Sequence, residues 1–361
     1  MYVVIGFKTF HNTVVLNNFL NSHTAIITRK IDYGELELSF LFGKKKGDTT
    51  RVLFATDMHG SEGTWRKFLN ASAMLKVNVA ICGGDLTGKM IVPIVQRKDE
   101  KYDYYLMGKV YTIDSDGLEK AFKDIRGIGY YPHQTDEYEY EEMRANPKKV
   151  DQVFHDVMTS TLERWFDLVR EKVPSETRVV VCPGNDDRTL VDEIVESHKD
   201  VINGEGRVIE IDGSHEMVSC GWVNPSPWKT AREEEEDKLE ERLERYISLV
   251  KDVKSAIFNF HAPPFESKLD EAPLLDKDLN PIIQGGSVVM VPVGSKAVRK
   301  MLEKYQPFLG LHGHIHESAG SMKIGKTHCV NPGSEYAEGI IRAFLIEFTG
   351  DKLSRLQRIE G

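Results

Sequence analysis

Five clusters of metal-binding side chains punctuate the chain. The clusters contain Asp57 and His59; Asp85; Asn185, Asp186 and Asp187; His261; and His314 and His316. Carboxylates, amides and imidazoles all bind divalent metal ions. Their joint occurrence predicts a single crevice filled with metal ligands.

Each cluster follows a short apolar run. The runs cover residues 52–55, 79–82, 179–182, 256–260 and 308–311. A short apolar run that ends in a turn is typical of a buried strand. Because ligands of an open α/β sheet bind beyond the carboxyl ends of its strands, we expect the five clusters to meet at one edge.

The spacing within two clusters predicts shared directions. Asp57 and His59, like His314 and His316, are two residues apart. On an extended strand such residues lie on the same side, where both can reach one metal ion. His312 alternates to the opposite side, so we expect it to be either packed in the core or bonded behind a ligand.

The other ligands each have an ordinary alternative role. Asp85 follows two glycines and suits a bridge in which each carboxylate oxygen binds one cation, but it could equally cap the next helix. Asn185 lies in a Gly-Asn-Asp-Asp sequence that is also a good turn. His261 could equally be a hydrogen-bonded loop histidine. The order and number of the clusters favour the metal interpretation over these alternatives.

The segments between the clusters predict how the strands are connected. Helices are expected near 61–76, 147–172, 231–252 and 295–304, where apolar residues recur at helical spacing. The acidic run from Glu233 to Glu236 is expected to lie on a solvated helix face near its start. Residues 89–146 interrupt the rhythm with tyrosine-rich alternating stretches and a helix at 117–126. This insertion is interpreted either as a lid or substrate-selecting wall or as an ordinary surface elaboration.

Bulk properties restrict the class of protein. The 361 residues are expected to form a β-rich appendage at 1–50 and one larger domain at 51–361. The net charge of −9 disfavours broad electrostatic binding to nucleic acid. The four cysteines show no CxxC spacing, which favours buried thiols in a reducing cytoplasm. No run approaches the ~18 apolar residues that span a bilayer, and the first residues lack the pattern of a signal peptide. We therefore expect a cytoplasmic protein with no membrane partner.

The motif series resembles that of the calcineurin-like metallophosphoesterases. The matching motifs are Asp57-x-His59, Gly84-Asp85, Gly184-Asn185-x-Asp187, His261 and Gly313-His314-x-His316, in this order over about 51–348. The stretch from Gly84 to Lys89 is similar to the Icc-related phosphoesterases of this superfamily. The resemblance implies a four-layer α/β/β/α sandwich, in which two mixed β-sheets are flanked by helices.

The resemblance also implies a dinuclear metal centre. Asp57, His59 and His316 would hold one ion, Asn185, His261 and His314 would hold the other, and Asp85 would bridge them. Mixed oxygen and nitrogen ligands suit Mn²⁺, Fe or Zn²⁺ rather than Mg²⁺ or Ca²⁺ alone. Two cations about 3.5–4 Å apart can clamp a phosphoryl group, which a hydroxide held between them would attack in line with the leaving oxygen.

The chain departs from the family pattern at two positions. Asp186 replaces the histidine that normally assists the leaving group. A carboxylate can donate a proton only when it is itself protonated, and an ionised carboxylate there would repel phosphate. Gly88 stands where a second acid is frequent, a position that is not usually a ligand.

The residues and the resemblance together favour a phosphodiesterase, or a phosphatase, that acts on a small phosphate ester or a nucleotide. Asp186 and His261 are the expected catalytic residues. A different class of function is a catalytically weak metal-binding scaffold or protein-interaction module on the same fold. Nuclease activity is a further alternative that the acidic net charge disfavours. The sequence leaves the substrate, the metal and the oligomeric state open.

Overall fold

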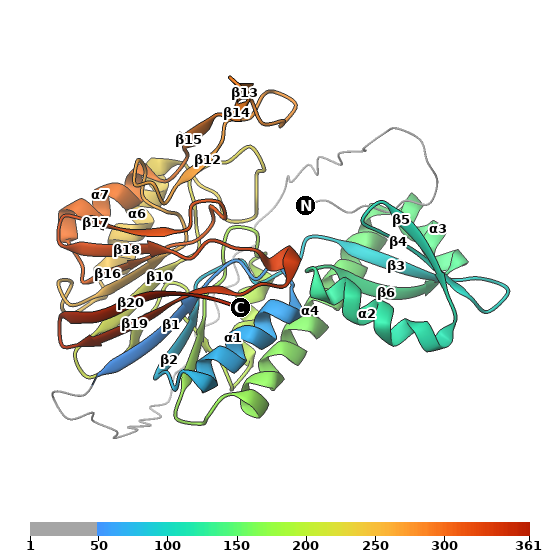
Figure 1. The fold of residues 1–361 in the computed structure, drawn as a ribbon, viewed down its shortest axis with the longest axis horizontal. Coiled ribbons are helices and arrows are strands. Elements are labelled where there is room, and N and C mark those ends of the chain that lie inside the picture. The colour runs from blue at the N-terminus through green and yellow to red at the C-terminus, as the bar shows by residue number, and fades with distance from the viewer. Residues whose placement is uncertain (1–48) are drawn as a thin grey trace, which may run out of the picture.

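The computed structural model describes residues 49–361 (Figure 1). The predicted β-rich appendage at 1–50 therefore lies outside the described residues, apart from its last two. The described chain is built around two six-stranded sheets.

The first sheet has the strand order β20-β19-β1-β2-β7-β8. Its strands are β1 (Thr50–Ala55), β2 (Val79–Cys82), β7 (Arg178–Val181), β8 (Ile202–Asn203), β19 (Arg342–Thr349) and β20 (Lys352–Glu360). Strands β1, β2, β7 and β8 are parallel, whereas β19 and β20 form an antiparallel edge. The sheet is therefore mixed, and the carboxyl ends of its parallel strands share one edge.

The second sheet has the order β17-β18-β16-β11-β10-β9. Its strands are β9 (Val208–Glu210), β10 (Glu216–Cys220), β11 (Ile257–Phe260), β16 (Leu309–Leu311), β17 (Gly320–Ile324) and β18 (Thr327–Asn331). The four central strands are parallel, and β9 and β17 close the sheet as antiparallel edges.

The two sheets pack face to face through an apolar layer. Phe54 and Ile81 of the first sheet share this layer with Met217, Ile257 and Leu309 of the second, all fully or almost fully buried. Such strands, buried on both faces, explain why their sequences are continuous apolar runs rather than alternating ones.

Helices cover the outer faces of both sheets (Figure 1). On the first sheet pack α1 (Glu62–Met74), α4 (Pro147–Lys172) and α5 (Leu190–Ser197), and on the second α6 (Glu236–Ile247) and α7 (Lys296–Tyr305). Trp65 of α1 and Trp165 of α4 stack with ring centroids 5.2 Å apart. The predicted four-layer α/β/β/α sandwich is confirmed.

Local sequence signals set the helix ends. Ser61 accepts a hydrogen bond from the Thr64 backbone N–H at the start of α1, and Ser295 does the same for Val298 at the start of α7. Asn146 caps α4, whose first residue is Pro147, a position where a missing N–H costs nothing. These signals place α1, α4 and α7 within a few residues of their predicted bounds.

The charged helix predicted at 231–252 is wrong in its length, because α6 covers only 236–247. Glu233 instead closes a turn by accepting bonds from Ser226 and Thr230. Glu236 accepts bonds from the backbone N–H groups of Lys296 and Ala297 and so caps α7. Glu233 and Glu236 are thus bonded to neighbouring segments, and the prediction of a solvated face does not hold for these two residues, whereas Glu235 is exposed at the start of α6 as predicted.

Residues 89–146 form a small sheet of their own, which lies at one end of the sandwich (Figure 1). Its strand order is β5-β4-β3-β6, and its elements are β3 (Ile91–Gln96), β4 (Tyr102–Leu106), β5 (Lys109–Ile113), β6 (Tyr131–Asp136), α2 (Leu118–Gly127) and α3 (Glu137–Ala145). A separate apolar cluster with Ile94, Tyr104 and Ile125 stabilises it.

A second excursion joins β11 to α7. It contains two short hairpins, β12 (Glu271–Pro273) with β15 (Met290–Pro292) and β13 (Ile283–Gln284) with β14 (Ser287–Val288). The four cysteines are free and buried, as expected. Among residues 49–361, no helix combines the length and apolar character needed to cross a membrane.

Candidate metal centre

The five predicted clusters meet where the carboxyl ends of both sheets adjoin. The loop after β1 is tied to the loop after β2, because Asp57 N donates to Gly84 O and His59 N to Asp85 O, each at 2.9 Å. In the second sheet, Gly313 N donates to His261 O at 3.0 Å. The five loops therefore meet as expected, but they come from the edges of two sheets rather than from one.

Four of the predicted ligand positions have left-handed backbone. The φ angles are 56° at Asp57, 42° at His59, 50° at Asp85 and 67° at His314. Such angles are uncommon for residues with a side chain and cost about 1–3 kcal/mol each. The surrounding fold must hold this strain, which concentrates at functional sites.

This backbone corrects the argument from spacing. The alternation of an extended strand does not apply to His314 and His316, because the chain turns at His314. Their imidazoles belong to different groups of side chains: His316 lies with Asp57 and His59, and His314 with Asp85 and His261.

The first group consists of Asp57, His59 and His316, whose ligand atoms all lie within 4.8 Å of one another. His316 Nε2 is 3.2 Å from Asp57 Oδ1 and 3.0 Å from His59 Nε2. Asp57 and His59 are buried, whereas the His316 side chain is 27% exposed. Two imidazole nitrogens and a carboxylate oxygen that face one another at this range fit a bound cation.

The second group consists of Asp85, Asn185, His261 and His314. The atoms of Asp85, His261 and His314 lie within 4.8 Å of one another. Asn185 Oδ1 is 3.1 Å from His261 Nε2, while its amide nitrogen donates to Thr230 Oγ1. The amide oxygen is thus turned toward the group, and the same donor chemistry fits a second cation.

Asp85 joins the two groups through a single oxygen. Its Oδ2 lies 3.5 Å from His59 Nε2 and 3.4 Å from His261 Nε2. Its Oδ1 accepts a hydrogen bond from Asp186 N at 2.9 Å. Only Oδ2 faces both groups, so the structure does not support the expectation that each oxygen binds a different ion.

Burial and charge together perturb the ionisation of the centre. Burial raises the pKa of Asp57, but His261, His316 and His59 outweigh it and hold that pKa well below its usual value. Burial lowers the pKa of His261, yet Asp85 and Asp57 raise it to about 9 overall. Burial dominates at His314 and lowers its pKa to about 4. In the metal-free protein one imidazole of this group is therefore charged and the other neutral.

Glycines precede the ligands because nothing larger fits. A Cβ on Gly84 would lie 2.1 Å from His261 Nδ1, and one on Gly184 would lie 2.2 Å from Asp85 Oδ1. Both distances are shorter than any van der Waals contact allows. The Gly-Asp and Gly-Asn pairs therefore let two loops approach one set of ligands.

Asp187 is a structural link rather than a ligand. Its buried carboxylate accepts bonds from Leu86 N, Thr87 N and Gly184 N at 2.8–2.9 Å and from Thr87 Oγ1 at 2.6 Å. Burial, reinforced by Asp85, raises its pKa to about 6. It locks the loop after β2 to the loop after β7.

His312 is packed in the core, the first of the two roles that the sequence predicted for it. It is fully buried, and its Nδ1 lies 2.8 Å from Phe260 O and 3.1 Å from Ala262 O. Burial lowers its pKa to about 4.

Sequence reasoning assigned no role to two side chains beside the centre. Lys89 Nζ lies 2.6 Å from Asp186 Oδ2. The Tyr336 ring lies 4.7 Å from the His59 ring and 5.9 Å from the His316 ring. The position of Lys89 directly after the Gly84–Gly88 loop was a usable signal, whereas nothing in the sequence near Tyr336 indicated its place.

Comparison with known proteins gives a partial sequence match and a fold match. No family model matches the sequence. The uncharacterized protein MJ1162 of Methanocaldococcus jannaschii is 34% identical over 162 residues. That match covers 44% of this chain and 65% of MJ1162, so the chain spans slightly less than two thirds of that protein.

Solved structures resemble the chain over most of its length. One crystal structure aligns over 86% of this chain and 99% of its own, with 16% identity and a TM-score of 0.51. The protein TT1561 of Thermus thermophilus aligns over 87% of this chain and 99% of its own, with 14% identity and a TM-score of 0.45. An archaeal phosphodiesterase aligns over 55% and 90%, with 13% identity and a TM-score of 0.23.

The layer order, the mixed sheets and the place of the ligand loops all agree with the expected architecture. The described chain therefore has the four-layer α/β/β/α architecture that the motif resemblance implies.

Proposed function

We propose that the protein is a phosphoesterase that depends on two divalent metal ions and that prefers phosphodiesters. The observation that supports this proposal is the pair of ligand groups that share Asp85 Oδ2. Asp57, His59 and His316 would hold one ion, Asn185, His261 and His314 the other, and Asp85 both. When bound, the ions would neutralise phosphoryl charge and lower the pKa of bound water.

Neighbouring residues keep the proposed ligands ionised and oriented for these ions. Asp57 stays ionised far into the acid range, because three histidines outweigh its burial and hold its pKa low. His314 N donates to both Asp57 oxygens, at 3.2 and 3.1 Å, which fixes the carboxylate. Four of the seven ligands are imidazoles, a composition that favours Mn²⁺, Fe or Zn²⁺. His261 is proposed as a ligand whose ring also faces Asp85.

The test is hydrolysis by metal-reconstituted protein. Metal-free protein is loaded with Mn²⁺, Fe²⁺, Zn²⁺ or Mg²⁺ and assayed on bis-p-nitrophenyl phosphate and p-nitrophenyl phosphate. We expect turnover with transition metals, faster on the diester than on the monoester. Protein that binds two ions and turns over neither substrate, nor any cyclic nucleotide, would instead support the scaffold alternative.

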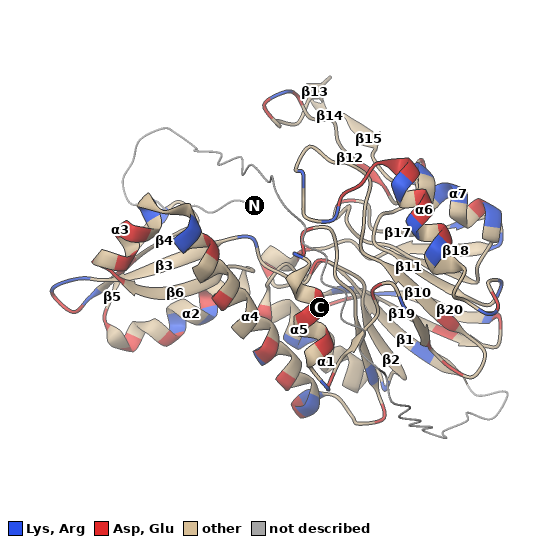
Figure 2. Cartoon of the chain, turned by 180° about the vertical axis from the view of Figure 1, so that it is seen from behind, with Lys and Arg blue, Asp and Glu red and all other residues tan. Residues whose placement is uncertain are grey.

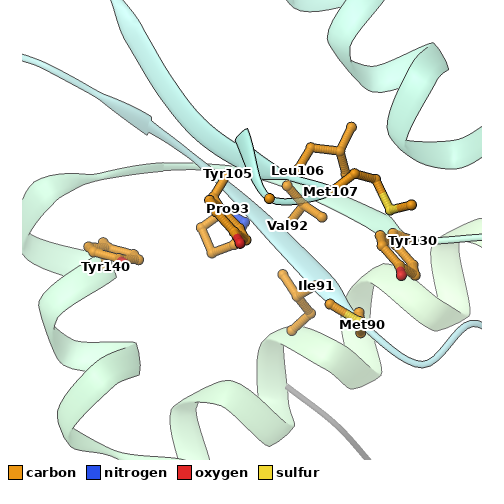
Figure 3. A pocket seen from close by; sticks show the side chains of 10 residues that line it. Met90, Ile91, Val92, Pro93, Tyr105, Leu106, Met107, Tyr130 and Tyr140 are labelled. Atoms are coloured by element: carbon orange, nitrogen blue, oxygen red, sulfur yellow. The ribbon is translucent and has the colours of Figure 1, made fainter. Parts of the chain in front are cut away.

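The proposed substrate selector is a pocket in the insertion. Its lining is almost entirely apolar or aromatic, and Figure 3 shows side chains from β3, from the end of β4 and the turn after it, and those of Tyr130 and Tyr140. The cavity holds about 240 Å³ and is lined by Met90, Ile91, Val92, Pro93, Tyr105, Leu106, Met107, Gly108, Tyr130 and Tyr140. This is below the roughly 300–1,000 Å³ of pockets that enclose a drug-sized ligand, so one ring or a short acyl chain fits.

Two lining residues of the pocket are close in sequence to residues that contact the metal centre. Met90 directly follows Lys89, and Gly129, next to Tyr130, lies against the ring of Tyr336. Burial raises the pKa of Tyr336, with Lys89 opposing and Tyr130 adding to the shift. An ester whose phosphate lies at the centre would therefore direct its organic group toward these side chains.

A pair of substrates tests this pocket. Bis-p-nitrophenyl phosphate and methyl p-nitrophenyl phosphate share a leaving group but differ in their second substituent. Met107 is 71% exposed, so Met107→Asp leaves the core intact. We expect KM to rise about tenfold for the diaryl ester alone, as loss of apolar contact predicts. Met74→Asp, at an exposed position on α1, is the control; equal KM changes for both substrates would contradict the proposal.

Nucleic acid remains the less favoured substrate. Two basic residues in or next to the insertion are already paired, Arg97 with Asp99 and Asp103, and Lys149 of α4 with Glu139. Figure 2 shows acidic and basic residues interspersed along α6 and α7. A mobility shift of single-stranded RNA or DNA that weakens steeply with salt would restore the nuclease alternative.

A further inference from the structure

Asp186 occupies the place at the centre where a negative side chain is least expected. Its carboxylate is 18% exposed, and its backbone N–H donates to Asp85 Oδ1 at 2.9 Å. An uncompensated carboxylate there would repel an incoming phosphate.

Lys89 compensates that charge. Its Nζ lies 2.6 Å from Asp186 Oδ2, and its side chain remains 38% exposed. The ammonium therefore contacts Asp186 and can still offer N–H groups to a molecule at the metal centre, because a lysine carries three donors.

The position of Lys89 is fixed by the loop that precedes it. Leu86 N and Thr87 N donate to Asp187, and Gly88 N donates to Tyr131 Oη at 2.7 Å. The chain then enters β3 at Ile91. Because both ends of this short segment are bonded, the backbone of Lys89 is held at a fixed position beside the metal centre.

Asp186 also faces the first ligand group. Its Oδ2 lies 3.6 Å from His59 Nδ1, while His59 Nε2 faces Asp57, Asp85 and His316. A carboxylate behind a metal-binding imidazole orients the ring. Asp186 Oδ2 thus lies between the Lys89 ammonium and His59 Nδ1, the ring nitrogen that faces away from the other ligands.

We propose that Lys89, positioned by Asp186, is the cation that binds a phosphoryl oxygen of the substrate at this centre, in the place where relatives use a histidine. The proposal rests on the proposed function. Lysine suits this role because its ammonium is a compact point charge that binds phosphate without a fixed fork geometry. Asp186 is then a positioning residue, and Lys89 touches the substrate.

A competing arrangement uses Asp186 as a metal ligand. His59, Asp85 and Asp186 also offer atoms within 4.8 Å of one another. The ammonium at 2.6 Å argues against it, because a cation bound to the same oxygen would lie close to another positive charge.

The test measures binding of inorganic phosphate to metal-loaded protein by titration calorimetry, with metal content determined in parallel. Lys89→Met is expected to retain two ions and to weaken phosphate binding about 10- to 100-fold, as loss of a charged hydrogen bond predicts. Lys89→Arg should stay within a few-fold of wild type. Lys98→Met, at an exposed position in the β3–β4 turn, is the matched control.

Asp186 variants separate positioning from ligation. Asp186→Asn should keep both ions, and adding it to Lys89→Met should recover part of the lost phosphate affinity, because the unpaired negative charge is gone. Loss of an ion in Asp186→Asn, or wild-type phosphate affinity in Lys89→Met, would overturn the proposal. A protein that binds phosphate through Lys89 but hydrolyses no ester would contradict the proposed function alone.

Discussion

The two ligand groups differ in their neighbours more than in burial or charge. Each contains buried ligands and one partly exposed histidine, His316 in the first group and His314 in the second. The first group also packs against the ring of Tyr336, which lies 4.7 Å from that of His59. In each group the pKa of one imidazole is raised and the pKa of the other is lowered. Burial lowers the pKa of His316, but Asp57 outweighs burial and raises it overall. Burial and the charge of Lys89 together lower the pKa of His59. The fold thus repeats one pattern of burial and charge in two places with different neighbours.

The largest effect is expected at Asp85, because both ligand groups share this residue. Asp85→Asn should remove the charge that both groups use and lower kcat by on the order of 10³-fold. Metal analysis should show fewer than two ions in the same preparation. Asp278→Asn, on an exposed turn, is the matched control. Unchanged turnover in Asp85→Asn would remove the basis for a common centre.

Single-group variants test whether the groups are independent. His261→Gln should lose the second ion and keep the first, and His316→Gln should do the reverse, with kcat lowered about 100-fold in each. The metal-to-protein ratio after gel filtration distinguishes the two. A loss of both ions in both variants would show a single cooperative site.

The metal affinity of the second group is expected to depend on pH. A metal ion needs a neutral imidazole, and the pKa of His261 is about 9 in the metal-free protein. Apparent affinity should therefore rise about tenfold per pH unit from pH 7 to 9, one proton being displaced per ion. Competition with a chelator at several pH values measures the slope; a flat profile would contradict the assignment.

The same histidine has a consequence for stability in the metal-free protein. Its pKa is higher folded than its usual 6.5, so the associated stability is fully present below pH 6.5 and is lost as pH rises through 9. The unfolding temperature of metal-free protein should fall over this range. Metal-loaded protein should lack this fall, because the ion has already displaced the proton.

The smallest expected effect concerns the order of metal loss. A chromogenic chelator should remove the first-group ion several-fold more slowly, because the Tyr336 ring lies 4.7 Å from that of His59 and covers this side. Tyr336→Ala should accelerate the slow phase and leave the fast phase unchanged; acceleration of both phases would show that Tyr336 does not shield the first group alone.

Strand ends, most helices and the layer order followed from the sequence. Buried parallel strands are recognisable as continuous apolar runs, and α4 is framed by Asn146 and Pro147, both strong local signals. The exposed strand β20 carries no such run and was not predicted. The start of α6 was misplaced because Glu233 is bonded to Ser226 and Thr230 rather than to the helix.

The arrangement of the side chains within the site was harder to predict from the sequence. All seven ligand positions were proposed from sequence, yet the spacing argument paired His314 with His316, and the left-handed backbone at His314 separates them. Lys89 meets Asp186, and Tyr336 meets His59, across long stretches of chain. Contacts of this kind have no local signature, because they depend on how distant loops pack.

The pairing of β1 also dictates when the centre can be assembled during synthesis. β1, whose loop carries Asp57 and His59, is bordered by β2 on one side and by β19 on the other, with Ala55 opposite Ala343. Such distant pairing is slow to form, and a nascent chain lacks β19 until residues 342–349 have left the ribosome. Metal acquisition is therefore expected only after β19 has emerged, and a bound pair of ions would mark a chain translated at least that far.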